Sequence, residues 1–133
     1  MTISRIFVAS LFLAAGAVRA EPPAPQAIVT PIMKKTLPDY PGKEAVMLTV
    51  DYPPGAVDPV HRHDADAFIY VVEGSIVMGL RGGTPVTLTP GQTFYEGPKD
   101  VHTVGRNASL TQAAKFVVLL LKNVDEDVFI PAH

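Results

Sequence analysis

Short apolar runs, each ended by glycine or proline, are the feature that most constrains how this chain folds. Strand-forming residues dominate these runs, and no stretch after residue 20 shows a long helical period. The runs occupy residues 44–52, 67–74, 75–80, 85–91, 92–98, 100–105 and 113–122. Many short strands separated by turn residues are typical of an all-β sandwich or barrel. The short connections favour antiparallel pairing between neighbours.

The final run, at residues 113–122, differs from the others. It contains the segment KFVVLLL, which has a polar residue only at its start. A strand of this kind is expected at the centre of a sheet or buried on both faces. A buried helix is the alternative, but the shortness of the run and its β-branched residues favour a strand.

The first twenty residues read as a secretory signal peptide. Arg5 is followed by an apolar stretch from residue 6 to 18, and small residues close the segment at Ala20. The stretch is short for a permanent membrane span, which needs roughly twenty residues. We expect cleavage after Ala20, with Ala17 as the alternative site, and a periplasmic or secreted protein. An uncleaved anchor or a buried helix are the competing interpretations.

Charge and cysteine content exclude several classes of protein. The net charge is −2, and it becomes −4 when the leader takes away two arginines and no acidic residue. The only basic run is Lys34-Lys35, so we expect no nucleic-acid partner, and no membrane contact after cleavage. The chain has no cysteine, so disulfides and thiolate ligands are excluded.

The mature chain divides into three parts. Residues 21–39 begin with a proline-rich stretch that predicts an extended arm or linker, residues 40–122 form the predicted barrel, and residues 123–133 form a C-terminal tail. The apolar part of the arm, residues 28–33, is too irregular for a barrel strand. It either pairs two copies edge to edge, giving a homodimer, or remains a flexible linker.

Two of the four histidines stand one residue apart, at His61 and His63. Side chains at i and i+2 of an extended segment point to the same side. The same parity continues into small and apolar residues, including Ala67, so this face should look into the barrel. His102, after the Gly97-Pro98 turn, is the remaining interior histidine. Three imidazoles could together hold one divalent metal, although an H-x-H pair alone is a weak motif.

Two segments resemble the motifs of the cupin superfamily, which are small jelly-roll barrels. The first, residues 53–74, keeps the family's spacing of glycine, H-x-H and closing glycine at Gly55, His61, His63 and Gly74. The second, residues 91–107, keeps the spacing from Gly91 to His102, but Pro98 and Asn107 each lie one residue late. The resemblance implies a single-domain double-stranded β-helix, or jelly-roll barrel, over roughly residues 40–122.

The resemblance breaks at one metal ligand. Cupins of this pattern carry a ligating glutamate at the position of Ala67. Asp66 is adjacent but has the opposite strand parity, and Glu96 in the second motif is the best substitute. The site implied is therefore His61, His63 and His102. The same three imidazoles serve iron, manganese, nickel, copper and zinc, so the ion stays open.

Three functions are compatible with these features. The first is a metal-dependent enzyme, dioxygenase- or isomerase-like, acting on a small anionic molecule. The second is a binding or sensing module for a small ligand or metal, and the third is a barrel whose histidines have lost their function. We expect aromatic and apolar residues at the pocket rim, without assigning them roles. They are Met47, Phe68, Tyr70, Phe94 and Tyr95.

Overall fold

The computed structural model describes residues 19–133, so the predicted leader, apart from its last two residues, lies outside the described part of the chain. These residues form ten strands and no helix, and so none long and apolar enough to cross a membrane. The strands are β1 (Ile28–Thr36), β2 (Lys43–Tyr52), β3 (His61–Arg62), β4 (Asp66–Glu73), β5 (Ile76–Leu80), β6 (Val86–Leu88), β7 (Thr93–Glu96), β8 (His102–Asn107), β9 (Ala114–Asn123) and β10 (Ile130–Pro131).

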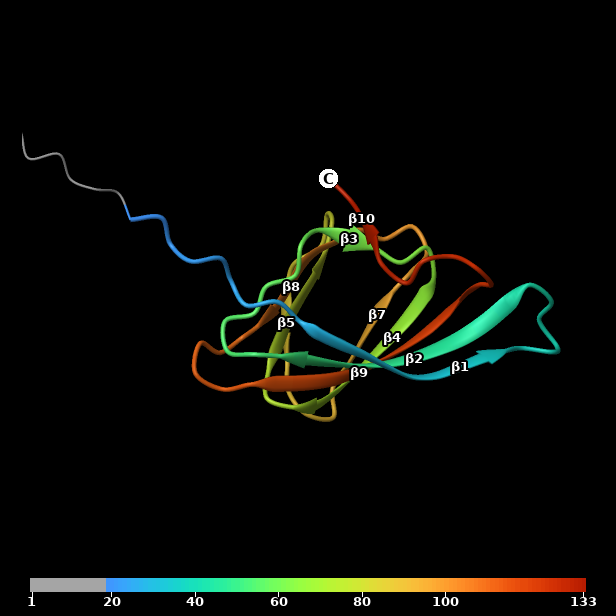
Figure 1. The fold of residues 1–133 in the computed structure, drawn as a ribbon, viewed down its shortest axis with the longest axis horizontal. Helices are drawn as coiled ribbons and strands as arrows, with labels where there is room; N and C mark the ends of the chain where they lie inside the picture. The colour runs from blue at the N-terminus through green and yellow to red at the C-terminus, as the bar shows by residue number, and fades with distance from the viewer. Residues whose placement is uncertain (1–18) are drawn as a thin grey trace, which may run out of the picture.

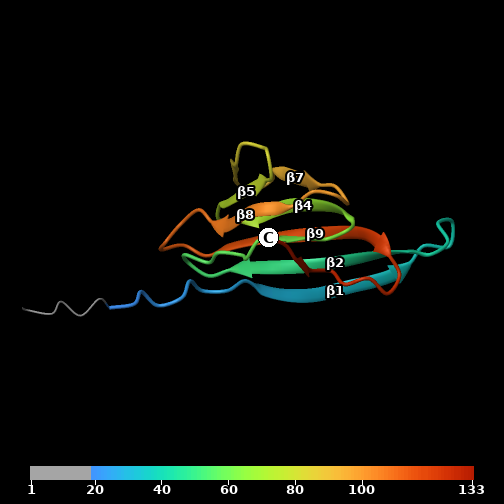
Figure 2. The same cartoon turned by 90° about the horizontal axis from the view of Figure 1, so that it is seen from above.

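The strands build two five-stranded antiparallel sheets that face each other (Figures 1 and 2). The first sheet has the order β1-β2-β9-β4-β7, and the second has the order β10-β3-β8-β5-β6. Neighbours along the chain often lie in different sheets, as in a double-stranded β-helix. The all-β prediction is confirmed.

Strand β9 occupies the middle of the first sheet, as the apolar run at residues 113–122 predicts. Its residues alternate between buried and half-buried, so only the inner face is fully covered. The expectation of burial on both faces is therefore not met. The other expectation, a position at the centre of the sheet, is met.

The segment at residues 28–36 corrects our interpretation of residues 21–39 as an arm outside the barrel. It forms the nine-residue strand β1, which pairs antiparallel with β2 through eight residue pairs, with a bulge between Pro31 and Met33. The bulge and Pro31 explain why the segment looks too irregular for a strand in the sequence. Residues 19–24, by contrast, run away from the barrel without regular structure (Figure 1). The chain meets the barrel at Pro25, whose carbonyl accepts a hydrogen bond from the Val57 amide at 3.2 Å, and at Ala27, which packs against the core.

The core lies between the two sheets and is filled by the inward side chains of both. Leu120, Ile76 and Val71 are completely shielded from solvent, and Met78 nearly so. Burial alternates along β2, β4 and β9, which is the period expected of strands with one face in a core. The inner face of β4 carries Ala67, as strand parity predicts.

Residues of the two sequence motifs fix the turns at one end of the barrel. Gly55 and Gly74 have φ angles of 74° and 67°, which L side chains rarely adopt. At Gly74 a Cβ atom would also lie 2.4 Å from the carbonyl oxygen of Ala113. Asn107 is buried and its amide donates to the backbone oxygens of Tyr52, Pro53 and Gln112 at 2.8–3.1 Å. That amide ties the loop after β2 to the loop after β8.

Candidate metal centre

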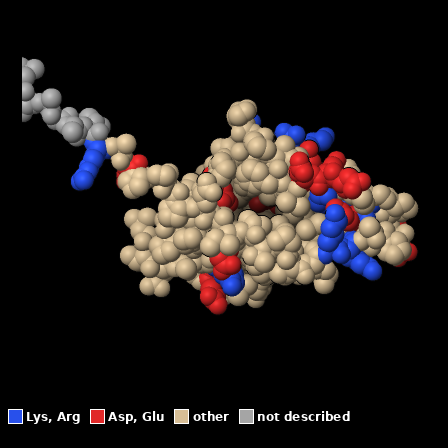
Figure 3. Space-filling view, viewed as in Figure 1, with Lys and Arg blue, Asp and Glu red and all other residues tan. Residues whose placement is uncertain are grey.

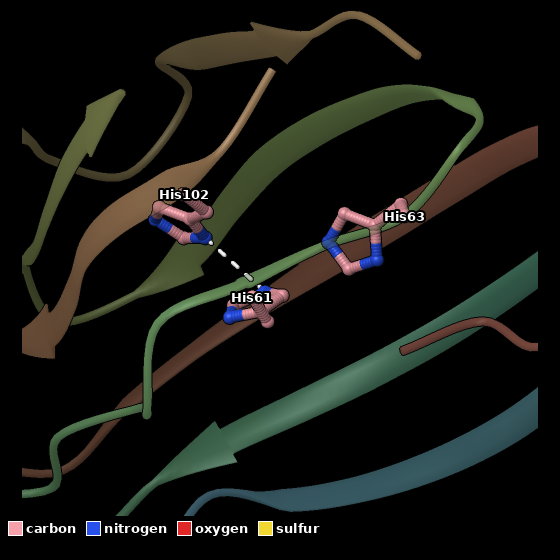
Figure 4. A group of neighbouring side chains, drawn as sticks. All are labelled: His61, His63 and His102. Atoms are coloured by element: carbon pink, nitrogen blue, oxygen red, sulfur yellow. Dashed lines mark hydrogen bonds between the residues drawn. The ribbon is translucent and has the colours of Figure 1, made fainter. Parts of the chain in front are cut away.

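The three predicted histidines lie together inside the barrel (Figure 4). His61 is on β3, His63 follows it directly, and His102 begins β8. His61 and His102 face each other across the β3–β8 pair, which brings residues 41 positions apart into contact. His61 and His102 are buried and His63 is half-buried.

One nitrogen from each ring turns toward a common point. The three nitrogens lie within 4.8 Å of one another. His61 Nε2 and His102 Nδ1 are 3.3 Å apart. Two ligands about 2.1 Å from one ion, at right or tetrahedral angles, are about 3.0–3.4 Å apart. The separation of His61 Nε2 and His102 Nδ1 is therefore that of two neighbouring donors around one ion, with the His63 ring close beside them.

Backbone carbonyls orient two of the rings. His61 Nδ1 donates to the carbonyl of Pro59 at 2.8 Å, and His63 Nδ1 donates to the carbonyl of Val128 at 2.5 Å. A proton on Nδ1 leaves the lone pair on Nε2, and Nε2 is the atom that faces the cluster in both rings. Such outer hydrogen bonds commonly fix the tautomer of metal-binding histidines.

The third ring, that of His102, packs closely against the backbone of its own strand. His102 Nε2 is buried and has no hydrogen-bond partner within residues 19–133. The ring lies over Gly105, where an added Cβ would come within 2.9 Å of His102 Cε1. Gly105 therefore gives His102 the room it needs, a role that no motif spacing indicates.

The C-terminal segment forms one wall of the centre. β10 pairs with β3, and the Phe129 ring stacks on His61 with centroids 4.5 Å apart. Val128 supplies the carbonyl that orients His63. Our description of residues 123–133 as a tail outside the barrel is thus corrected. Val128 and Phe129 follow several acidic residues, so no apolar pattern in the sequence predicts that they contact the site.

Glu96 also points into the centre, from the end of β7. Its carboxylate oxygens lie 3.5 Å from His102 Nδ1 and 3.6 Å from His63 Nε2. The side chain is buried, and its direct cross-strand partner is Ala67. Asp66 faces outward, where it accepts a hydrogen bond from the Tyr95 hydroxyl at 2.6 Å, as its parity predicts.

Burial sets the protonation of these groups. It lowers the pKa of His61 and His63, and it lowers the pKa of His102 to about 4. Burial also raises the pKa of Glu96 to about 7. The imidazoles are therefore neutral at physiological pH, which is the form that binds a metal. Among residues 19–133, no positive group holds the Glu96 carboxyl ionised.

The cluster opens onto a cavity of about 100 Å³. Figure 3 shows a hollow in the middle of one face, with acidic side chains visible inside it. The wall combines the histidines and two acidic groups with apolar side chains of both sheets. These apolar residues include Leu48, Val50, Ile69, Met78, Phe116 and Val118.

A second polar pair lines the same cavity. The hydroxyl of Tyr52 donates to Asp58 Oδ2, and both residues belong to the cavity wall. Burial raises the pKa of Tyr52 well above its usual range and also raises the pKa of Asp58. Tyr52 thus keeps its proton, which it shares with Asp58. The pair was not among the sequence candidates, because neither residue belongs to a spacing motif.

Most residues expected at the pocket rim lie elsewhere. Phe68, Tyr70 and Tyr95 are about half exposed on the outer face of the first sheet. Met47 lies on the same face, and Phe94 packs against the core. The strand parity that places Ala67 inside also sends Phe68 and Tyr70 outside, so the rim prediction was wrong for them.

The residues present fit a divalent metal. Three neutral nitrogens converge, two of them are oriented by carbonyls, and a carboxylate faces the same point without hydrogen bonds of its own within the described residues. This donor set suits iron, manganese, nickel, copper or zinc. The open cavity leaves room beside the donors, as in catalytic rather than closed structural sites.

Fold and site together define a small double-stranded β-helix with a histidine cluster inside it. The cupin domain family matches residues 48–120, which is more than half of the chain. The chain therefore belongs to the cupin family. No curated protein sequence matches it.

Solved structures share the fold at low sequence identity. A double-stranded β-helix protein from Klebsiella pneumoniae is similar with a TM-score of 0.64 and 16% identity, over 84% of this chain and 90% of that one. A cupin domain from Bordetella pertussis gives 0.59 and 24%, over 75% and 97%. The DMSP lyase DddQ from Ruegeria pomeroyi gives 0.58 and 20%, over 66% and 43%. This chain thus spans less than half the length of that lyase.

Proposed function

We propose that this protein binds one divalent metal through His61, His63 and His102 and uses it to bind and transform a small anionic molecule. The observation that carries the proposal is the convergence of three neutral imidazole nitrogens on the wall of the cavity. A metal held there would act as a Lewis acid that polarises a bound oxygen atom. Dioxygenase- and isomerase-like reactions both use such a centre.

The cavity limits the size of the substrate. Its volume of about 100 Å³ is well below the roughly 300–1,000 Å³ of pockets for drug-sized ligands. The space suits a molecule of a few heavy atoms. Apolar side chains from both sheets would pack against its carbon atoms, and the excess positive charge of a metal on neutral imidazoles would favour a carboxylate or enolate.

Tyr52 and Asp58 give the cavity a proton donor and acceptor beside the histidines. In the proposed function the Tyr52 hydroxyl orients a polar atom of the substrate, and Asp58 holds the hydroxyl in place. The alternative is a binding or sensing module, in which the same groups fix a ligand that is not transformed. Turnover of a bound small acid separates the two.

The similarity to DMSP lyases gives a reason to assay lyase activity, but it does not assign that activity to this protein. These enzymes share less than 25% identity with this chain, and the match covers less than half of their own length. Lyase activity is therefore tested alongside oxygenase and isomerase activity. We also propose export with removal of residues 1–20, which N-terminal sequencing of the protein from its own host would test.

Metal titration of single alanine variants tests the proposal. His61→Ala, His63→Ala and His102→Ala should each weaken Ni²⁺ or Mn²⁺ binding by more than the roughly 10–100-fold cost of losing an outer partner. His133→Ala, at the chain end, is the control and should bind as the unaltered protein does. Full metal occupancy in the His61→Ala, His63→Ala double variant would refute the proposal.

A further inference from the structure

We infer that Glu96 is the fourth protein ligand of the metal centre, and that it replaces across the sheet the carboxylate that position 67 lacks. The inference rests on the proposed metal site and deepens it. It gives the site a mixed nitrogen and oxygen donor set, drawn from both sheets of the barrel.

Strand register places the carboxylate where it is needed. Ala67 and Glu96 are direct partners in the antiparallel pair of β4 and β7. Directly opposite residues on one face have Cβ atoms about 4.5–5.5 Å apart. Both side chains are buried and point inward, so a glutamate on either strand can reach the same space.

The distances fit a ligand rather than a hydrogen-bonded acid. Glu96 Oε1 is 3.5 Å from His102 Nδ1, and Oε2 is 3.6 Å from His63 Nε2. Both separations exceed those of ordinary hydrogen bonds, which are about 2.7–3.2 Å. Both lie close to the separation of about 3.0–3.4 Å expected between neighbouring donors around one ion.

The small side chain at position 67 is consistent with a ligand on the opposite strand. Ala67 is fully shielded from solvent, and its methyl group takes up far less room opposite Glu96 than a glutamate would. A glutamate at both positions would put two buried carboxylates opposite each other, which like charge disfavours. The two strands therefore hold alternative places for one ligand, and this chain uses the place on β7.

The resulting site carries one formal positive charge. Three neutral imidazoles leave the charge of a divalent ion intact, and one carboxylate removes a unit of it. The substrate class narrows accordingly to monoanions, since a single carboxylate or enolate neutralises the centre within a cavity of about 100 Å³.

A carboxylate swap tests the inference by calorimetric titration of the metal-free protein with Ni²⁺ and Mn²⁺. Glu96→Gln keeps the shape and should weaken binding at least about tenfold. Ala67→Glu alone should give no gain, whereas the Glu96→Ala, Ala67→Glu double variant should recover most of the affinity lost in Glu96→Ala. Glu73→Gln, an exposed acid on β4, is the matched control and should change nothing.

The Co²⁺ absorption spectrum gives a second readout. Loss of an oxygen ligand in Glu96→Gln should shift the ligand-field bands, and Glu73→Gln should leave them in place. Metal affinity and Co²⁺ bands of Glu96→Gln that equal those of the unaltered protein would overturn the inference while leaving the three-histidine site intact. Absence of metal binding in the unaltered protein would overturn the proposed function and this inference together. Should Glu96→Ala fail to fold, the isosteric Glu96→Gln decides alone.

Discussion

Gly105 shows how one missing side chain can decide the geometry of a ligand. A Cβ at this position would lie 2.9 Å from the His102 ring, closer than real contacts allow, and 3.1 Å from Asp58 Oδ2, which is tighter than most. We expect Gly105→Ala to push the ring away from the cluster and to lower metal affinity about tenfold or more. Gly83→Ala is the matched control, because its nearest neighbour stands 3.4 Å away and its backbone is unstrained. Equal affinity of both variants in a metal titration would contradict this role.

At the scale of elements, the C-terminal segment contacts the metal centre, which the sequence did not indicate. Val128 orients His63, Phe129 stacks on His61, and β10 pairs with β3. A chain that ends at residue 127 should therefore lose roughly 10–100-fold in metal affinity, the usual cost of removing an outer partner. A chain that ends at Pro131 keeps these contacts and serves as control. Circular dichroism of both should show an intact barrel, so that unchanged affinity in the shorter chain would exclude the role.

At the scale of the whole molecule, the outer face of the first sheet stands out because no other part of residues 19–133 covers its apolar side chains. Apolar and aromatic side chains cross all five strands on this face, and most are exposed or half-exposed. They include Met33, Met47, Phe68, Tyr70, Tyr95, Val117 and Leu119. Patches of this kind mark association surfaces. Two copies stacked through the same face form a closed, symmetric dimer.

We expect the protein to be a homodimer held together by this face. The bulge after Pro31 hinders edge-to-edge pairing through β1, so face packing replaces the edge pairing that the sequence led us to expect. Light scattering at micromolar concentration should give twice the chain mass. Leu119→Lys, at the centre of the face, should give the monomer, whereas Val86→Lys, an exposed apolar site on the other sheet, should not. A monomeric unaltered protein would refute the expectation.

The sequence by itself determined the elements and half of the site. Alternating apolar residues and glycine or proline punctuation fix local conformation, so the main strands between residues 43 and 123, their faces and the turns at Gly55 and Gly74 were predictable. Strand parity likewise predicted that His61 and His63 share an inward face and that Asp66 does not. These properties depend on neighbours within a few residues, and such neighbours are visible in a sequence.

Only the tertiary structure decided which distant residues share the site. The pairing of Ala67 with Glu96, the contact of Phe129 with His61 and the room that Gly105 leaves for His102 all depend on register between strands. Register is set by the packing of the whole barrel, and a shift of one residue would reverse every side chain. Short-range patterns carry no such information, and this is why β1 appeared as an arm and residues 123–133 as a tail.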